Sequence, residues 1–189
     1  SDQMNLMVRD LPQVTISNES TCDGESVTLS ANPFIPNWRY NWSNGHTGNE
    51  MTYTPSGTGL NDITVIVTDE FNCVGSHTAQ VYVYELPEFS LLDKDACVGI
   101  ETIISAPTGY RNYSWSSGQV GTSSIRVTPW YTQYISCEVE DYNGCKNSES
   151  MLLTVHEPVP LVMNDVDACQ GDIVTLTGPS GFDQYTWSN

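Results

Sequence analysis

Cysteine is the residue type whose spacing in this 189-residue chain most clearly implies chemistry. Three cysteines begin a Cys-x-Gly triplet and two end a D-x-x-x-C motif: Cys22, Cys97 and Cys169, then Cys73 and Cys145. Such regular pairs predict a disulfide framework, which persists only in an oxidising compartment. We predict the bridges Cys22–Cys73 and Cys97–Cys145, each closing a loop of roughly 50 residues and contributing about 4 kcal/mol. For Cys169 we expect a partner beyond the chain end.

Cys137 belongs to neither motif. Aligned on Asp141, it takes the place that Val65 has in the preceding repeat, on the inward face of a core strand near Trp115. We interpret it as a buried thiol that acts as a small hydrophobic side chain. The alternatives are a second disulfide or a reactive thiol.

The histidines give no sign of catalysis. His46, His77 and His156 fall at unrelated positions, and the sequence contains no HExxH, GxSxG or phosphate-loop pattern. The cysteine spacing also differs from that of a CxxC zinc site. We therefore expect that the chain is not an enzyme.

Acidic residues near the expected turns and junctions raise the question of calcium. Carboxylate oxygens on loops between β-modules are suitable calcium ligands, but Asp and Asn side chains also stabilise turns without a metal. We expect no cofactor and keep structural calcium as the alternative. The calcium candidates are Asp69, Asp93, Asp95, Asp141, Asp165 and Asp167.

Three aromatic residues outside the repeated motif are candidates for binding a ligand. Trp38, Trp130 and Tyr131 have ring faces suited to stacking on sugars. Trp130 follows Pro129 at a strand end, where its ring could equally cover a sandwich edge or pack on a neighbouring module. Surface glycans and other cell-surface proteins are the external partners we consider, beside adjacent repeats of the same chain.

The charge balance excludes two classes of partner. Six Lys and Arg stand against 23 Asp and Glu, which gives a formal net charge of -17. Binding to nucleic acid needs clustered basic residues that neutralise phosphates, and an anionic membrane surface would repel this chain. We expect neither nucleic-acid binding nor direct membrane insertion.

A long period organises the whole sequence. The motif Y-x-W-S recurs at intervals of about 72 to 75 residues, and its aromatic residues are Tyr40 and Trp42, Tyr113 and Trp115, Tyr185 and Trp187. Two complete modules, 11–85 and 86–157, are predicted. Residues 1–10 match the last strand of a preceding module, and 158–189 match the N-terminal part of a truncated third repeat.

The hydrophobic pattern predicts the fold of each module. Apolar residues alternate with period two, as in half-buried antiparallel strands, at Val27/Leu29/Ala31, Ile63/Val65/Val67, Ala79/Val81/Val83, Ile135/Cys137/Val139 and Val174/Leu176. About seven short strands in about 75 residues describe an immunoglobulin-like β-sandwich. We expect an all-β tandem array with one disulfide per module and short proline-containing junctions. The Tyr and Trp of each Y-x-W-S motif are predicted core residues.

Laid end to end, these motifs resemble a known family. The run through Cys22, Tyr40-Asn41-Trp42-Ser43-Asn44-Gly45, Val67-Thr68-Asp69 and Cys73, repeated through Cys97 to Cys145, is similar to immunoglobulin-like or PKD-like repeats of large Bacteroidetes surface proteins. These proteins are typified by gliding-motility adhesins that the type IX secretion system exports. The resemblance covers nearly the whole chain and implies a long, repeat-built protein at the cell surface.

The functional hypothesis follows from the repeat and the resemblance. We expect a non-enzymatic extracellular segment of an adhesin or filament, which serves as a stiff stalk for adhesion or gliding. One alternative is a spacer or glycan-binding module of a secreted enzyme. Another is a subunit of an extracellular fibre in which modules exchange strands.

Overall fold

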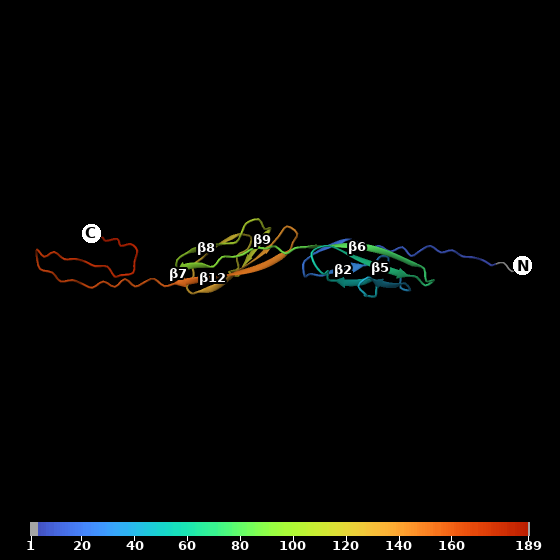
Figure 1. Ribbon diagram of the computed structural model, residues 1–189, viewed down its shortest axis with the longest axis horizontal. Helices are drawn as coiled ribbons and strands as arrows, with labels where there is room; N and C mark the ends of the chain where they lie inside the picture. Colours follow the sequence, from blue (N-terminus) through green and yellow to red (C-terminus); the bar gives the residue numbers. More distant parts are fainter. Residues whose placement is uncertain (1–3, 189) are drawn as a thin grey trace.

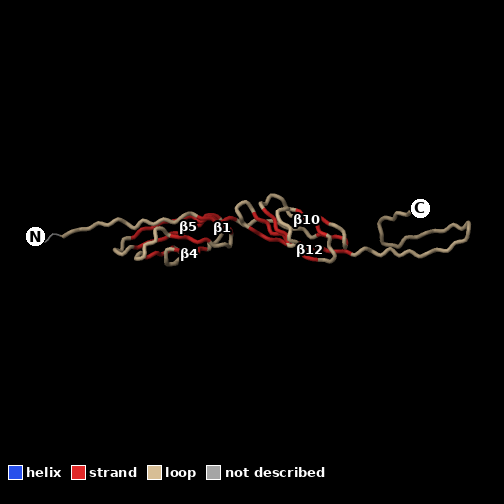
Figure 2. The backbone as a smooth tube through the Cα atoms, turned by 180° about the vertical axis from the view of Figure 1, so that it is seen from behind, coloured by secondary structure: helices blue, strands red, loops and turns tan. Residues whose placement is uncertain are grey.

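The structure, a computed structural model, describes residues 4–188 and is all-β, as predicted. Two β-sandwiches follow one another along the long axis, and the segments 4–10 and 157–188 extend from opposite ends of the pair (Figures 1 and 2). The strands of the first are β1 (Glu19–Cys22), β2 (Val27–Ser30), β3 (Arg39–Trp42), β4 (Glu50–Tyr53), β5 (Gly59–Thr68) and β6 (Val74–Tyr84). Those of the second are β7 (Lys94–Cys97), β8 (Thr102–Ser105), β9 (Asn112–Trp115), β10 (Ser124–Val127), β11 (Gln133–Glu140) and β12 (Lys146–His156). Residues 4–188 include no helix that is long and apolar enough to cross a membrane.

The first sandwich packs a four-stranded sheet on a two-stranded one. The larger sheet has the order β1-β6-β5-β3, and the smaller pairs β2 with β4. Alternate residues of β5 point inward, so Ile63, Val65 and Val67 are at most 2% exposed while Thr64 and Ile66 face outward. This alternation follows from the two-residue period of a strand and buries one face of each sheet.

The second sandwich repeats this arrangement strand for strand. Its larger sheet has the order β7-β12-β11-β9, and β10 pairs with β8. Each unit therefore has six strands within the described residues, whereas about seven were expected. The segment 87–93 forms no strand pair, and the segment 12–18 forms an isolated antiparallel bridge between Thr15 and Asn32. The predicted immunoglobulin-like sandwich is confirmed as the fold of both units.

In each sandwich, the segment that precedes the first strand runs along the last strand. In the first unit, Ile16 N–H donates to His77 Nδ1 at 3.3 Å and Gln80 N–H donates to Asn18 Oδ1 at 2.8 Å. In the second, Leu152 N–H donates to Asp93 Oδ1 at 2.7 Å. The approach is close enough that a β-carbon on Gly75 would lie 1.9 Å from the Pro12 carbonyl oxygen, so glycine is required there.

The two end segments form no strands in the described residues. The segment 4–10 is exposed, although Arg9 places its guanidinium 3.4 Å from the centroid of the Phe71 ring. Residues 157–188 also lack strands, and Val174 and Leu176 are 41% and 56% exposed. The described residues of both ends thus contain no strands, because no neighbouring strand lies beside them to accept their backbone hydrogen bonds. The assignment of these ends to pieces of further modules stays a prediction. Residues 1–3 and 189, which belong to the predicted end segments, lie outside the described residues.

Candidate functional site

The D-x-x-x-C motif folds into the same turn in both sandwiches. Asp141 Oδ1 accepts hydrogen bonds from the backbone N–H groups of Asn143 and Cys145 at 2.9 and 2.8 Å. Asp69 Oδ1 accepts from Phe71 and Cys73 at the same two distances. An aspartate that binds the backbone two and four residues later fixes the turn. The motif therefore holds its cysteine at the start of the last strand, β6 or β12.

The Cys-x-Gly cysteines lie at the other end of that same last strand. Strand β1 runs parallel to β6 and places Cys22 opposite Tyr84, while Cys73 directly precedes β6. The 11 residues of β6 span about 36 Å at roughly 3.3 Å per residue. Disulfide geometry tolerates at most about 7 Å between Cα atoms, so Cys22 and Cys73 are too far apart to bridge.

The disulfide joins the two sandwiches instead. Cys22 lies at the end of the first sandwich where β6 finishes, and it is bonded to Cys145 in the turn that precedes β12 of the second sandwich. The Cα atoms of the two cysteines are 5.5 Å apart, and 123 positions separate them in the sequence. The predicted pairs Cys22–Cys73 and Cys97–Cys145 are therefore wrong. The reason is topological: Cys22 ends β1, which runs parallel to β6, so it lies at the opposite end of β6 from the D-x-x-x-C turn that holds Cys73.

The junction around this bridge is packed. Cys22 is 7% exposed and Cys145 is 1% exposed. Asn143, from the turn of the second unit, lines a hollow together with Gly59, Tyr84 and Glu85 of the first unit. Besides the covalent bond, the two units thus share a surface made by the turn and by the strand ends opposite it.

The connecting segment 85–93 is fastened to the second sandwich. Asn147 Nδ2 donates to the Pro87 carbonyl at 3.0 Å, and Tyr110 Oη donates to the Glu88 carbonyl at 2.7 Å. Leu91 is 8% exposed and belongs to the core of the second unit. The proline restricts its own torsion and that of Leu86. The connection therefore has several anchors in addition to the disulfide.

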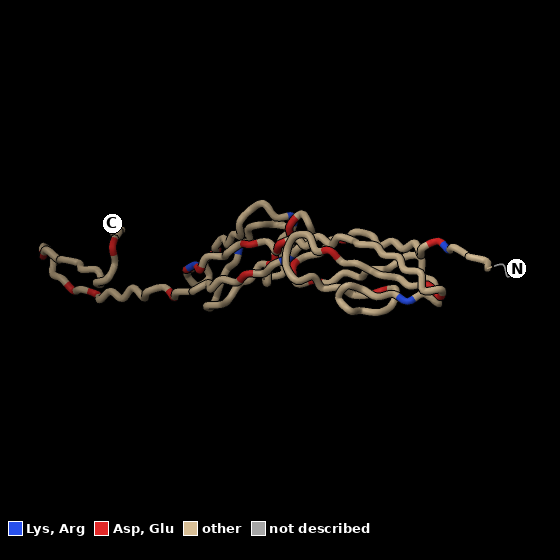
Figure 3. Tube along the Cα trace, turned by 45° about the vertical axis from the view of Figure 1, so that its right-hand side comes forward, with Lys and Arg blue, Asp and Glu red and all other residues tan. Residues whose placement is uncertain are grey.

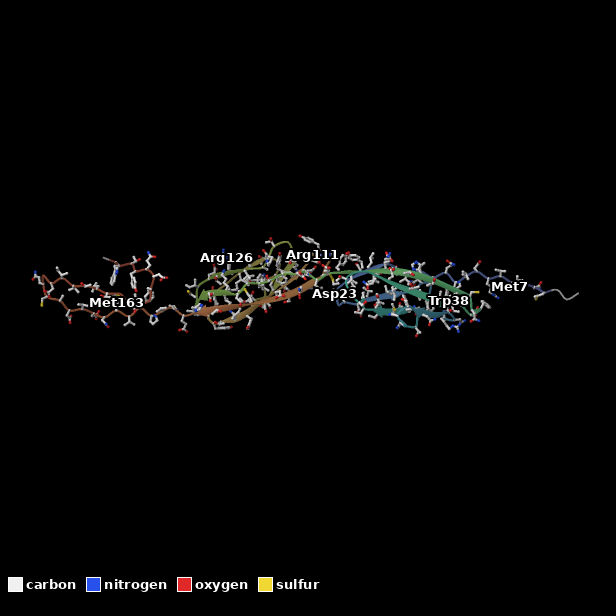
Figure 4. All side chains as sticks on the ribbon, viewed as in Figure 1. Met7, Asp23, Trp38, Arg111, Arg126 and Met163 are labelled. Atoms are coloured by element: carbon white, nitrogen blue, oxygen red, sulfur yellow. A yellow bond between two sulfur atoms is a disulfide. The ribbon has the colours of Figure 1, made fainter. Side chains whose placement is uncertain are left out.

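Charges at the junction are mostly negative and exposed. Figure 3 shows acidic residues on both sandwiches and along the tail, with few basic ones. Arg111 Nη1 lies 3.2 Å from Glu140 Oε1, and this pair is largely exposed on the arginine side. Asp23 and Arg111 both lie near the junction (Figure 4). An exposed ion pair of this kind contributes about 0 to 1 kcal/mol, so the disulfide and the packed turn dominate the contact.

A comparison with solved structures finds matches of low identity and low TM-score. Fibronectin(III)-like modules of Clostridium thermocellum CbhA match with a TM-score of 0.38 and 13% identity, over 77% of this chain and 95% of that one. The insect immune protein hemolin matches with a TM-score of 0.38 and 14% identity, over 78% of this chain and 46% of that one. The first two immunoglobulin domains of DIP-gamma match with a TM-score of 0.32 and 11% identity, over 78% and 98%. No family model matches the chain. No curated protein sequence matches it either.

The aromatic pair of the Y-x-W-S motif is buried in both sandwiches. Tyr40 and Trp42 are 4% and 3% exposed, and Tyr113 and Trp115 are 7% and 3% exposed. Their polar atoms are satisfied in the same way: Trp42 Nε1 donates to the Gly48 carbonyl at 2.8 Å, and Trp115 Nε1 donates to the Thr122 carbonyl at 2.9 Å. A buried indole needs such a partner. Tyr40 and Trp42 therefore belong to the core of the first sandwich, and Tyr113 and Trp115 belong to the core of the second.

The third copy of the motif is not buried in the described structure. Tyr185 and Trp187 are 44% and 47% exposed, which differs from the predicted core role, because no sheet forms around them in residues 157–188. One local contact of the motif is nevertheless present. Tyr185 Oη donates to the Pro179 carbonyl six residues earlier, as Tyr113 Oη donates to that of Pro107.

Cys137 occupies the position of Val65. It pairs with Trp115 across β11 and β9, as Val65 pairs with Trp42, and it is fully buried. Burial raises the pKa of its thiol; a backbone hydrogen bond with Ser114 opposes this effect, and the charge of Glu138 adds to it. A buried, protonated thiol is a poor nucleophile.

The calcium candidates are not brought together. Within residues 4–188 no group of three or more His, Cys, Asp or Glu side chains is arranged to hold a metal ion. Asp69 and Asp141 each bind their own turn, Asp93 binds the N–H of Leu152, and Asp95 Oδ1 lies 2.7 Å from His156 Nε2. Asp165 and Asp167 are exposed in the strandless segment 157–188.

The three aromatic ligand candidates lie in different places. Trp38 is partly buried against the first core, near the N-terminal end of the rod (Figure 4). Trp130 and Tyr131 are 71% and 67% exposed and follow β10, close to Gly99. They therefore do not form one binding surface with Trp38.

Proposed function

We propose that this chain is a non-enzymatic segment of an extracellular adhesin or filament, in which disulfide-stapled sandwiches form a stiff stalk. The observation that carries the proposal is the Cys22–Cys145 bridge, because it joins neighbouring modules rather than stabilising each one internally. A bond inside a module would add stability but leave the hinge free. A bond across the junction, together with the anchored segment 85–93, restricts bending and twisting.

Two further properties support a stalk outside the cell. The bridge needs an oxidising compartment, and a formal net charge of -17 keeps an extended surface soluble and free of nonspecific anionic partners. The finer attribution, to gliding-motility adhesins exported by the type IX secretion system, rests on the sequence resemblance. A spacer in a secreted enzyme uses the same geometry, with its chemistry on other domains.

The test compares the flexibility of the rod with and without the bridge. Small-angle X-ray scattering of the oxidised chain should give a narrow distribution of dimensions typical of a rigid rod. The Cys22→Ser variant should give a broader distribution and a smaller radius of gyration, since the two units then sample bent arrangements.

The matched control is a Cys73→Ser/Cys97→Ser double variant, which removes two thiols but leaves the junction bridge intact. It should scatter like the wild type. If the Cys22→Ser variant, with both sandwiches folded, also scatters like the wild type, the bridge does not stiffen the rod and the proposed role is wrong.

A further inference from the structure

The end of the second sandwich that faces away from the junction has the same local structure as the end of the first sandwich that forms the junction. Strand β7 is parallel to β12 and places Cys97 opposite His156, as Cys22 lies opposite Tyr84. The next residue makes the same bond in each unit: Val98 N–H donates to the His156 carbonyl at 3.0 Å, and Asp23 N–H donates to the Tyr84 carbonyl at 2.9 Å. Cys97 is thus held as Cys22 is, on the backbone of the last strand.

The two ends differ in what covers them. Cys22 is buried in the junction, whereas Cys97 is an exposed free thiol. Two large apolar side chains at the same end are exposed as well: Ile100 is 62% exposed and Trp130 is 71% exposed. Trp130 belongs to this end, because a β-carbon on Gly99 would lie 3.4 Å from its ring and Gly99 N–H donates to the Pro129 carbonyl at 2.8 Å.

The opposite end of the rod carries the complementary half. The turn that holds Cys73 has the hydrogen bonds of the turn that holds Cys145: Asp69 N–H donates to the Cys73 carbonyl at 3.0 Å, and Asp141 N–H donates to that of Cys145 at 2.9 Å. Cys145 is bonded and 1% exposed, while Cys73 is free and partly exposed. Each sandwich therefore presents a turn cysteine at one end and a strand-end cysteine at the other.

We propose that the end formed by Cys97, Ile100, Trp130 and Tyr131 is a docking surface for the D-x-x-x-C turn of a following module of this same type, and that Cys97 forms a disulfide with the cysteine of that turn. The occupant is a module of this type placed after Glu157, as the second sandwich follows the first; residues 158–188 carry two markers of such a module, the Cys-x-Gly motif at Cys169 and the Tyr185–Pro179 hydrogen bond. This inference rests on the proposed stalk function and extends the staple along the array.

The bond forms by thiol–disulfide exchange with a disulfide oxidant such as oxidised glutathione. The Cys97 thiolate attacks the oxidant and releases one reduced thiol, and the thiolate of the docked turn then displaces the second. Two cysteine protons and two electrons pass to the oxidant, and one sulfur–sulfur bond replaces another. Within one chain, Cys137 is buried and Cys145 is already bonded, while Cys73 lies at the opposite end of the first sandwich. A bond from Cys97 to Cys169, or to Cys73 of a second copy, is the competing result that the experiment detects.

The experiment supplies the missing turn within the full chain. A second copy of residues 86–157 is inserted directly after Glu157, which reproduces the Glu-Leu-Pro connection at 85–87. The copy carries Cys97→Ser and Lys146→Arg, so that its peptides around positions 97, 130, 131 and 145 differ in mass from the original ones. After oxidation in a glutathione buffer, mass spectrometry of the unreduced digest should find two bridges. One is Cys22–Cys145, and the other joins Cys97 to the inserted counterpart of Cys145, with loss of Cys97 labelling.

The matched control carries Cys97→Ser at the original position of the same inserted chain as well, and there the inserted turn cysteine should remain labelled. A second measurement does not depend on the bridge. Hydroxyl-radical footprinting should show Trp130 and Tyr131 protected in the inserted chain and reactive in the original one, since the docked turn covers them.

Three outcomes overturn the proposal. One is a free Cys97, or a Cys97 bonded elsewhere, in a molecule whose Cys22–Cys145 bridge is intact; the stalk proposal survives that result. Another is that Trp130 and Tyr131 stay reactive, as expected of an open glycan-binding surface. Failure of Cys22–Cys145 itself to form contradicts the stalk proposal as well.

Discussion

At the scale of single residues, Cys137 shows how a thiol is used as a core side chain. The same position holds valine in the first sandwich, opposite the tryptophan of the Y-x-W-S motif in both units. The thiol side chain is smaller than the isopropyl group of valine by roughly the volume of one methyl group, and both are apolar enough to pack beside the indole. The position therefore requires a small apolar side chain, and the reactivity of the thiol is not used there.

We predict that Cys137→Val lowers the free energy of unfolding at pH 7 by about 1 to 3 kcal/mol, because it adds roughly one methyl group to a fully buried position. The difference should depend on pH. Because burial raises the pKa of the Cys137 thiol, its contribution to stability is fully present below the ordinary thiol pKa and is lost as pH rises through the raised value. The wild type should thus lose stability relative to the variant in alkaline solution, as urea denaturation at pH 7 and pH 10 will measure.

The matched control is Val65→Cys, which places a thiol at the equivalent site of the first sandwich. It should introduce the same alkaline loss into that unit. Rapid labelling of Cys137 in the native protein would contradict the interpretation, because a buried thiol must wait for the sandwich to open.

At the scale of elements, the D-x-x-x-C turn is the part on which the junction depends. Asp141 Oδ1 binds two backbone N–H groups and so presents Cys145 toward Cys22. The parallel first strand performs the complementary task at the other end of each sheet. Both elements recur, since the same turn holds Cys73 in the first sandwich and the same parallel strand holds Cys97 in the second.

We predict that Asp141→Ala lowers the free energy of unfolding by about 1 to 3 kcal/mol, because it leaves the Asn143 and Cys145 N–H groups without their acceptor. Asp141→Asn keeps an acceptor oxygen and should cost less than half as much. Thermal denaturation of both variants, with Asp69→Ala and Asp69→Asn as the equivalent pair in the first sandwich, measures the difference.

The same experiment separates turn stabilisation from calcium binding. If Asp141 served a metal, the asparagine variant would be about as damaging as alanine, and a chelator would lower the melting temperature of the wild type. An unchanged melting temperature in EGTA together with a mild asparagine variant is the result we expect.

At the scale of the whole molecule, the junction bridge changes the path that carries force. Tension applied at the two ends passes along the chain to Cys22, crosses to Cys145 and leaves along β12. Residues 23–144 lie inside the closed loop and carry no tension through their own backbone. Most strands of both sandwiches are therefore shielded from being pulled open.

We predict that the oxidised chain, pulled from its ends in a single-molecule experiment, does not release the segment between the bridged cysteines. The two cysteines are 123 residues apart, which corresponds to roughly 400 Å of extended chain at about 3.3 to 3.6 Å per residue. Reduction of the bridge should make this length available as the two sandwiches unfold.

The Cys22→Ser variant should behave like the reduced wild type even in oxidising buffer. An oxidised wild type that extends by the full length would show that the bridge does not form or does not bear the load. Such a result would count against a mechanical role for the staple.

The sequence by itself determined the repeat, the all-β sandwich, the burial of Cys137 and the burial of the Tyr and Trp in two of the three Y-x-W-S motifs. These features are local: alternation at Ile63, Val65 and Val67 fixes which face is buried, and an aspartate fixes its own turn. Cysteine spacing also indicated an oxidising compartment.

Only the tertiary structure decided which cysteines meet. Cys22 is closer in sequence to Cys73 than to Cys145, but Cys22 and Cys73 lie at opposite ends of β6, because the first strand pairs in parallel with the last. Cys22 and Cys145 are 123 residues apart and in bonding contact, because two units are stacked end to end. Sequence distance does not report strand direction or stacking, and those two properties turn a set of cysteines into a staple between modules.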